Sequence, residues 1–131
     1  MSIFSHDKAG RPECPYIERW IADFKVFSIR LHHWLASDDQ RYFHDHAWWF
    51  VSFLFWGSYI ERTPQGETIR HAPSIRFYPA LHQHIVIVKK PCWTLLLTGK
   101  ESRKYGYWVN GRFRKRNKYF YEHGLHPCDK P

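Results

Sequence analysis

Short runs in which apolar and polar residues alternate follow one another along most of the chain, a pattern typical of β-strands with one buried face. The expected strands cover residues 22–35, 42–46, 50–56, 68–78, 82–88, 93–98 and 104–109. Asn110 and Gly111 lie between two aromatic-rich runs and predict a two-residue hairpin turn. Residues 15–24 are the only candidate for a helix longer than two turns.

This pattern predicts an all-β fold, and a chain of 131 residues has the size of a single domain. Residues 1–20 are expected to form an N-terminal arm, and residues 122–131 a C-terminal tail or lid. Aromatic residues make up 19% of the chain, which is enough for a substantial core. A sandwich, a barrel and a jelly roll all fit such a series of short strands.

Composition argues against a membrane protein and against a secreted one. The sequence has no 18-residue apolar stretch, and its first eleven residues lack the apolar segment of a signal peptide. The three cysteines, Cys14, Cys92 and Cys128, are widely spaced, which suits a reducing compartment better than a disulfide framework. We therefore expect a cytoplasmic protein with no membrane partner.

The formal net charge of +8 favours anionic partners. Part of this charge lies in a basic segment whose cations share one strand parity, namely Arg112, Arg114, Arg116 and Lys118. Two interpretations stay open for this segment. It is either the charged outer face of an edge strand, which blocks edge-to-edge pairing, or a surface for nucleic acid or another partner. Homodimer formation is left open as well.

Strand geometry places two imidazoles for metal binding. His44 and His46 are two residues apart, so in a strand they point to the same face. A third imidazole can come from residues 79–84, where His82 and His84 share one parity. We favour His84 as the third ligand and keep His82 as a substitute or a fourth ligand.

The first of these segments resembles the first motif of the cupin superfamily. That motif holds two histidines separated by one residue, followed by a glutamate and then a glycine. His44, His46 and Gly57 match it, but the glutamate position falls at Phe50 or Val51. The carboxylate ligand of the usual cupin site is therefore absent from this position.

The second segment resembles the second cupin motif, which holds a proline, a glycine and a histidine. Pro79 and His84 match it, whereas Leu81 replaces the glycine. What remains is similar to the three-histidine variant of the site found in thiol dioxygenases. The resemblance implies a double-stranded β-helix, the cupin jelly roll, with little helix and a divalent metal held by three histidines.

A second resemblance, to a family of small uncharacterised cupin-like proteins of bacteria and phages, covers nearly the whole chain. Its motifs lie at residues 13–16, 31–34, 43–46, 92–99, 103–108 and 119–129. It implies one cupin-like domain over residues 1–131 in a bacterial or phage-infected cell, and it carries no known function.

Three neutral imidazoles leave positions open on a divalent ion, where a substrate or dioxygen can bind. Without a carboxylate ligand the ion keeps its full charge and attracts a small anionic molecule. We expect an iron oxygenase with Fe(II), and zinc, nickel and manganese are the other candidate ions. Two alternatives stay open: a non-redox zinc or nickel lyase or isomerase, and a basic module that binds a nucleotide, nucleic acid or a protein partner.

Other side chains are candidates for supporting roles. His32 and Glu61 are expected to orient the metal ligands from behind. The candidates for substrate binding on flanking strands are Arg76, Tyr78, Arg103 and Tyr105. His126 and Cys128 could meet Cys14 and bind a second metal, and the alternative is a tail that docks over the mouth of a barrel.

Overall fold

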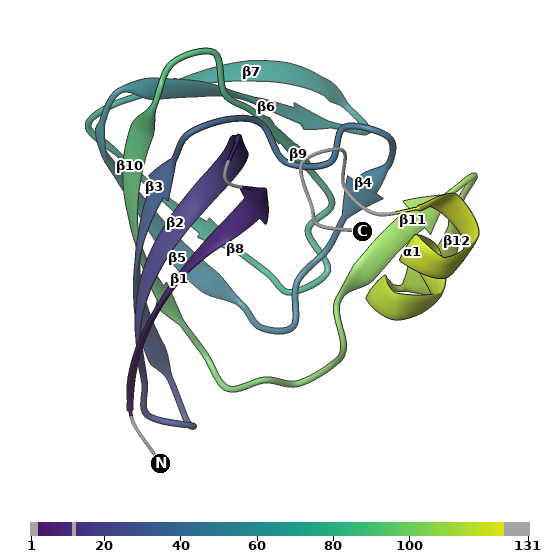
Figure 1. The fold of residues 1–131 in the computed structure, drawn as a ribbon, viewed down its shortest axis with the longest axis horizontal. Coiled ribbons are helices and arrows are strands. Elements are labelled where there is room, and N and C mark those ends of the chain that lie inside the picture. Colours follow the sequence, from purple (N-terminus) through teal and green to yellow (C-terminus); the bar gives the residue numbers. More distant parts are fainter. Residues whose placement is uncertain (1–2, 12, 125–131) are drawn as a thin grey trace.

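The computed structural model describes residues 3–11 and 13–124, which form an antiparallel β-structure with one short helix (Figure 1). In chain order the strands are β1 (Phe4–Arg11), β2 (Cys14–Asp23), β3 (Ser28–Trp34), β4 (Phe43–His44), β5 (Phe50–Trp56), β6 (Ser58–Thr63), β7 (Gly66–His71), β8 (Ser74–Tyr78), β9 (Ile85–Ile87), β10 (Cys92–Thr98), β11 (Gly106–Val109) and β12 (Arg112–Lys115), and helix α1 (Arg116–His123) follows. The expected all-β fold with little helix is confirmed.

The strands form one large sheet and two small ones. The large sheet has the order β1-β2-β3-β10-β5-β8, and the small sheets have the orders β12-β11-β4 and β7-β6-β9. Figure 1 shows these sheets curving around a shared interior. His44 of β4 and His84, which directly precedes β9, exchange backbone hydrogen bonds of 3.2 and 3.1 Å. This pair joins the two small sheets, so the strands form a rolled structure of two facing layers.

The candidate helix over residues 15–24 is wrong, because this segment lies in β2 and the turn that follows it. β2 pairs with β1 along one edge and with β3 along the other, which satisfies its backbone groups on both sides. Its isoleucine, tyrosine and tryptophan residues also favour an extended backbone. The described part of the expected N-terminal arm is therefore built into the large sheet.

The basic segment divides between a strand and a helix. β12 lies at the edge of its sheet and ends at Lys115, and α1 begins at the next residue. The strand parity expected to run to Lys118 therefore stops three residues earlier. Alternation of basic and aromatic residues did not reveal the helix, because only one residue of the helix is buried against the sheet. One buried residue leaves no repeated apolar pattern in the sequence.

That residue is Tyr119, whose side chain is fully buried and stacks on the ring of Tyr107 at 3.9 Å. At the C-terminal end of α1, Arg41 donates hydrogen bonds to the carbonyl groups of His123 and Gly124, at 2.6 and 2.9 Å. These carbonyl groups have no partner within the helix, so the guanidinium caps them. The short helix is thus held at its middle and at its end.

The predicted hairpin at Asn110 and Gly111 is confirmed. Both residues have positive φ angles, 52° and 79°, as a tight turn of this type requires. The strands on either side, β11 and β12, pair without a shift in register.

Two groups of buried side chains fill the interior. One consists of Leu54, Tyr59, Val86, Val88 and Cys92, and the other of Phe50, Tyr78 and Leu96. In the part of the chain that the structure describes, no helix has the length and apolar character needed to cross a membrane.

The cysteines differ in state. Cys14 is disulfide-bonded, whereas Cys92 is a free thiol whose pKa burial raises to about 11. The expectation of reduced cysteines therefore does not hold for Cys14, because spacing along the chain does not show which side chains meet in space. His126 and Cys128 lie outside the described residues. A cysteine in a disulfide has no thiolate to offer to a metal, so the second metal site predicted with Cys14 does not fit this state of Cys14.

Candidate metal centre

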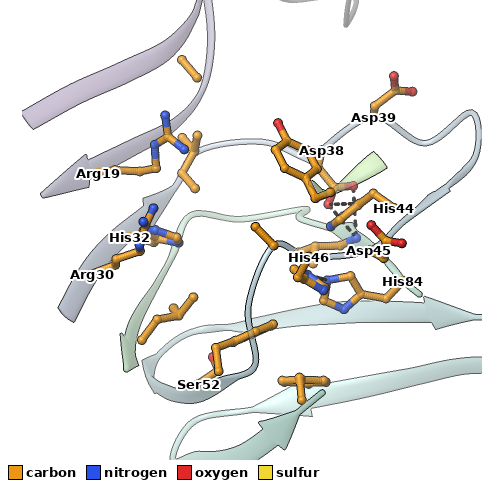
Figure 2. Close-up of a pocket in the computed structure, with 18 of the residues that line it drawn as sticks. Arg19, Arg30, His32, Asp38, Asp39, His44, Asp45, His46, Ser52 and His84 are labelled. Atoms are coloured by element: carbon orange, nitrogen blue, oxygen red, sulfur yellow. Dashed lines mark hydrogen bonds and ion pairs between the residues drawn. The ribbon is translucent and has the colours of Figure 1, made fainter. Parts of the chain in front are cut away.

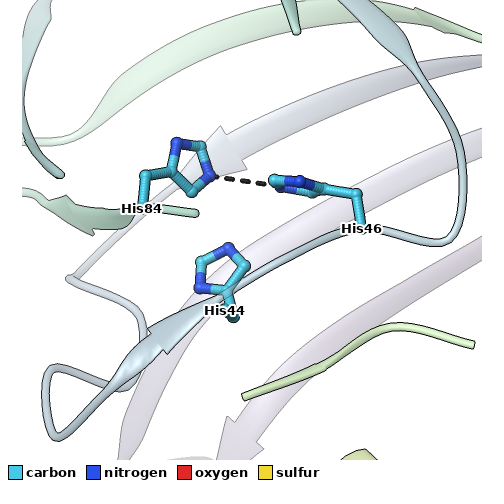
Figure 3. A group of neighbouring side chains, drawn as sticks. All are labelled: His44, His46 and His84. Carbon is cyan, nitrogen blue, oxygen red and sulfur yellow. Dashed lines mark hydrogen bonds between the residues drawn. The ribbon is translucent and has the colours of Figure 1, made fainter. Parts of the chain in front are cut away.

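The three favoured ligands come from two segments that meet through their backbones. His44 lies in β4, His46 follows it by two residues, and His84 directly precedes β9. Besides the His44–His84 pair, the His46 N–H donates to the Ala80 carbonyl at 2.9 Å. Figure 3 shows the three rings facing one another, with centroids 4.8 to 5.3 Å apart.

The ring nitrogens of these residues converge. One nitrogen from each ring lies within 4.8 Å of the other two, and Nε2 of His46 is 3.2 Å from Nε2 of His84. Two imidazole nitrogens that each bind an ion at about 2.0–2.1 Å lie about 3 Å apart. This pair therefore already has the spacing of two ligands of one ion, and three imidazoles suit a divalent transition metal.

Burial keeps the imidazoles neutral. Burial first, and the neighbouring histidine rings second, hold the pKa values of His44 and His46 well below the ordinary value. Burial also lowers the pKa of His84, although the contact with Glu61 acts in the opposite direction. A neutral imidazole has a lone pair to offer to a metal. The site is thus ready to bind an ion at neutral pH.

Glu61 orients His84 from behind. Its Oε2 lies 2.7 Å from His84 Nδ1 and 2.9 Å from His82 Nε2, and its Oε1 accepts a hydrogen bond from Arg70 at 2.9 Å. This arrangement places the proton of His84 on Nδ1 and leaves Nε2 free to bind a metal. Burial raises the pKa of Glu61, but the hydrogen bonds from His82, His84 and Arg70 outweigh it and hold the pKa well below its usual range. His82 contacts the same carboxylate, and Glu61, His82 and His84 are a second group whose ligand atoms all lie within 4.8 Å of one another. The role of His82 as a fourth or substitute ligand stays a prediction.

Strand parity does not relate Glu61 to His44, because the chain passes from one sheet to another between them. The passage occurs at Gly57, between β5 of the large sheet and β6 of a small one. Gly57 has a φ of 86°, and a Cβ atom there would lie 2.8 Å from Cβ of Cys92. Glycine is therefore required at this turn, and the turn brings Glu61 to the interior from the opposite layer.

Asp45 holds the ligand segment from its other side. Its fully buried carboxylate accepts hydrogen bonds from the Gly106 N–H at 2.8 Å and the Trp108 Nε1–H at 2.9 Å. It also pairs with Arg103 at 2.8 Å, and Arg103 donates to the carbonyl of His46 at 3.1 Å. The structure therefore uses Arg103, a predicted substrate contact, to fix the backbone of the ligand segment.

A cavity of about 600 Å³ lies against the histidines. Tyr78 and Tyr105, both predicted substrate contacts, line it together with Trp48. Tyr78 also donates a hydrogen bond to Oε1 of Glu61 at 3.4 Å. Arg76 pairs with Ser52 across the sheet, but its side chain is exposed on β8, at the sheet edge, and it is not among the described residues that line the cavity.

The far end of the cavity holds polar residues that the sequence did not reveal as a group. Figure 2 shows Arg19, Arg30 and His32 together at one end and the three metal-site histidines at the other. His32 was expected to support the metal ligands, yet it lies at this far end. Burial first, and then Arg19 and Arg30, lowers the pKa of His32 to about 3. The sequence feature that could have indicated this group is the strand parity shared by Arg30 and His32, which places their side chains on one face of β3.

The cations of the basic segment have unequal surroundings. Arg114 lies 3.5 Å from Glu122, and the guanidinium of Arg116 lies 4.9 Å above the ring centre of Phe120. Arg112 and Lys118 are exposed, and neither forms an ion pair within the described chain. Two of the four cations are therefore engaged within the protein.

Comparison with known proteins bears on the architecture. The sequence matches no protein-family model and no curated protein. Its structure is similar to that of the polyketide cyclase RemF from Streptomyces resistomycificus, with 14% identity, a TM-score of 0.63 and coverage of 91% of this chain and 87% of that one. For FeII HppE the identity is 11% and the TM-score is 0.60, and the match covers 72% of this chain and 56% of that one. An RmlC-like cupin from Shewanella frigidimarina has 13% identity and a TM-score of 0.56, and the match covers 74% of this chain and 86% of that one.

This chain thus spans little more than half the length of the HppE chain. At such low sequence identity the likenesses show the fold alone. They agree with the rolled sheets and with the single short helix. The chain has the fold of the cupins.

Proposed function

We propose that the protein is a metal-dependent enzyme, an oxygenase that holds Fe(II) on His44, His46 and His84 and acts on a small anionic molecule. The observation that supports it is the convergence of three neutral imidazoles at the wall of a cavity of about 600 Å³. A divalent ion bound there supplies positive charge and open coordination positions, and iron also supplies redox chemistry with dioxygen. The similarity in fold to FeII HppE, named for its ferrous iron, is consistent with this choice.

The surrounding residues support the proposal in two ways. Glu61 and Asp45 fix the two ligand segments through buried hydrogen bonds, so the imidazoles are held in place before an ion arrives. The aromatic side chains of Trp48, Phe50 and Tyr78 line the cavity and restrict the access of water.

The experiment is metal analysis of protein purified without oxygen, followed by titration with Fe(II) and then with nitric oxide. We expect stoichiometric Fe(II) and the electron paramagnetic resonance signal of a ferrous nitrosyl centre, because nitric oxide requires an open position on the ion. The double variant His44→Ala/His46→Ala should show neither. His71→Ala is the matched control, since His71 is exposed at the end of β7. Failure of the wild-type protein to bind Fe(II) would refute the proposal.

A non-redox zinc or nickel lyase or isomerase is the second candidate. The similarity in fold to a polyketide cyclase, which covers most of both chains, favours it, because that protein is named for a cyclisation and not for an oxygenation. Stoichiometric zinc or nickel in the purified protein, together with no nitrosyl signal after iron titration, would decide for this candidate.

A further inference from the structure

The end of the cavity opposite the metal-site histidines has polar side chains that metal binding does not use. We call this group, made of Arg30, His32, Ser52 and Thr94, the arginine end. Strand register explains why they gather: Thr94 pairs with His32, and Leu96 stands between Arg30 and Ser52 in the next row. All four residues of the group line the same cavity as the metal-site histidines.

Arg30 has a positive charge without a matching carboxylate. Its Nε donates a hydrogen bond to Oγ of Ser28 at 3.0 Å, and its guanidinium lies 4.8 Å above the ring centre of Trp48. Within the described chain no acidic side chain lies in ion-pair contact with it. The neighbouring Arg19 differs, because its Nε and Nη2 atoms donate to the carboxylate of Asp7 at 2.8 and 2.9 Å. At this end of the cavity the guanidinium of Arg30 therefore faces the interior without a carboxylate in direct contact.

His32 and Thr94 are buried polar groups without partners. The side chain of His32 is 7% exposed, and neither of its ring nitrogens has a hydrogen-bond partner among the described residues. Thr94 is 3% exposed, and its Oγ1 also has no hydrogen-bond partner among the described residues. Buried polar atoms in folded proteins are nearly always hydrogen-bonded, because leaving them unpaired is costly. A bound molecule with a hydrogen-bonding group would satisfy both.

We propose that the arginine end is a carboxylate subsite, in which the guanidinium of Arg30 binds the carboxylate of a small organic acid while His32 and Thr94 bond to a polar group on its body. This inference rests on the proposed function, because it names the class of substrate whose other end would face the metal. A planar guanidinium forms paired hydrogen bonds with a carboxylate. One guanidinium without an ion-pair partner at this end of the cavity matches a monoanion better than a phosphate with about two negative charges.

The test uses nuclear magnetic resonance on ¹⁵N-labelled protein, with 3-phenylpropionate as the probe and 3-phenylpropanamide as its neutral match. We expect a saturable shift of the Arg30 Nε–H signal with the acid and none with the amide. Arg30→Gln should weaken binding of the acid by about ten- to a hundredfold, since hydrogen bonds to charged groups have that effect. Arg62→Gln is the control: Arg62 pairs with Glu67 and does not line the cavity.

Parallel titrations of metal-free and zinc-loaded protein separate this inference from the proposed function. Arg30 is not a ligand, so the acid should bind without metal, and Arg30→Gln should keep its metal content. Acid binding that survives in Arg30→Gln but disappears from metal-free protein would place the carboxylate on the ion and overturn the subsite. Equal binding of acid and amide would overturn it too. If Arg30→Gln does not fold, the wild-type Arg30 signal and the Arg30→Lys variant, expected to bind with intermediate affinity, decide the question.

Discussion

Oε2 of Glu61 lies 2.7 Å from Nδ1 of His84, and both groups are buried in the roll. The carboxylate thus acts on the metal site without being a ligand, because it sets which nitrogen of His84 has the proton. A carboxylate behind a metal-binding imidazole also makes that imidazole a stronger donor. The glutamate missing from the first segment is in this sense replaced by one that stands behind the third histidine.

Glu61→Gln should weaken metal binding by about 10- to 100-fold, because the amide has no charge to hold the imidazole of His84 in its metal-binding form. Competition with a chelator of known affinity measures the change. Glu67→Gln is the matched control, since this exposed carboxylate on β7 pairs with Arg62. An unchanged affinity in Glu61→Gln would show that packing alone orients His84.

Single alanine replacements of His44, His46 and His84 should each abolish stoichiometric metal. They should also remove the rise in melting temperature that metal gives, because binding at 100 times Kd stabilises the folded state by about 2.7 kcal/mol. His71→Ala and His123→Ala should retain both properties. Calorimetry with and without metal, together with elemental analysis, measures them. Metal that remains in the His44→Ala/His46→Ala double variant would contradict the assignment.

Stability should depend on pH through His32. Its pKa is about 3 in the folded protein, lowered by burial and by Arg19 and Arg30, against 6.5 as the ordinary value. Between these values the unfolded chain binds more protons than the folded one, so stability is highest above pH 6.5 and falls as the pH drops toward 3. The loss from this residue is about 1.4 kcal/mol per pH unit.

Urea unfolding of metal-free protein at several pH values tests this prediction. The plot of unfolding free energy against pH should be flatter between about pH 6 and pH 4 in His32→Asn than in the wild-type protein, by the contribution of one proton. Identical slopes would mean that His32 takes up its proton in the folded state at its ordinary pKa.

Replacing Arg112, Arg114 and Arg116 by glutamine should leave the metal content unchanged, because none of them contacts a metal-site histidine in the described structure. The same variant tests the basic segment as a nucleic-acid surface. If the segment binds phosphates, affinity for a labelled oligonucleotide should fall, and its log-log salt dependence should flatten by about one unit per lost contact. Fluorescence anisotropy at several salt concentrations provides both values, and equal curves would identify a solvated strand edge.

Local pattern was enough to predict the elements in which one strand has one clear face. The position of His84 after Pro79 and the turn at Asn110 needed no knowledge of the rest of the chain. The strand expected over residues 42–46 ends at His44, and the ring of His46 still meets those of His44 and His84. The sequence did not show that residues 15–23 belong to a strand, because β2 is stabilised by pairing with strands on both of its sides.

The same limit applies to the cavity. Glu61 could not be placed by counting from His44, because Gly57 redirects the chain into another sheet. Arg30 and His32 share a parity, but nothing in the sequence says which face of β3 is the inner one. Cross-strand neighbours such as Thr94 decide that, and they are distant in sequence.

The hydrogen-bonded pair of His44 and His84 is also the junction between two sheets. Two small sheets meet there through the backbones of two residues whose side chains face the same ion site. An ion bound by both rings would stabilise this junction, and loss of the ion would allow the two small sheets to separate transiently there. The exchange of the two amide hydrogens with deuterium should therefore slow on metal loading, so that the backbone itself reports whether the site is filled.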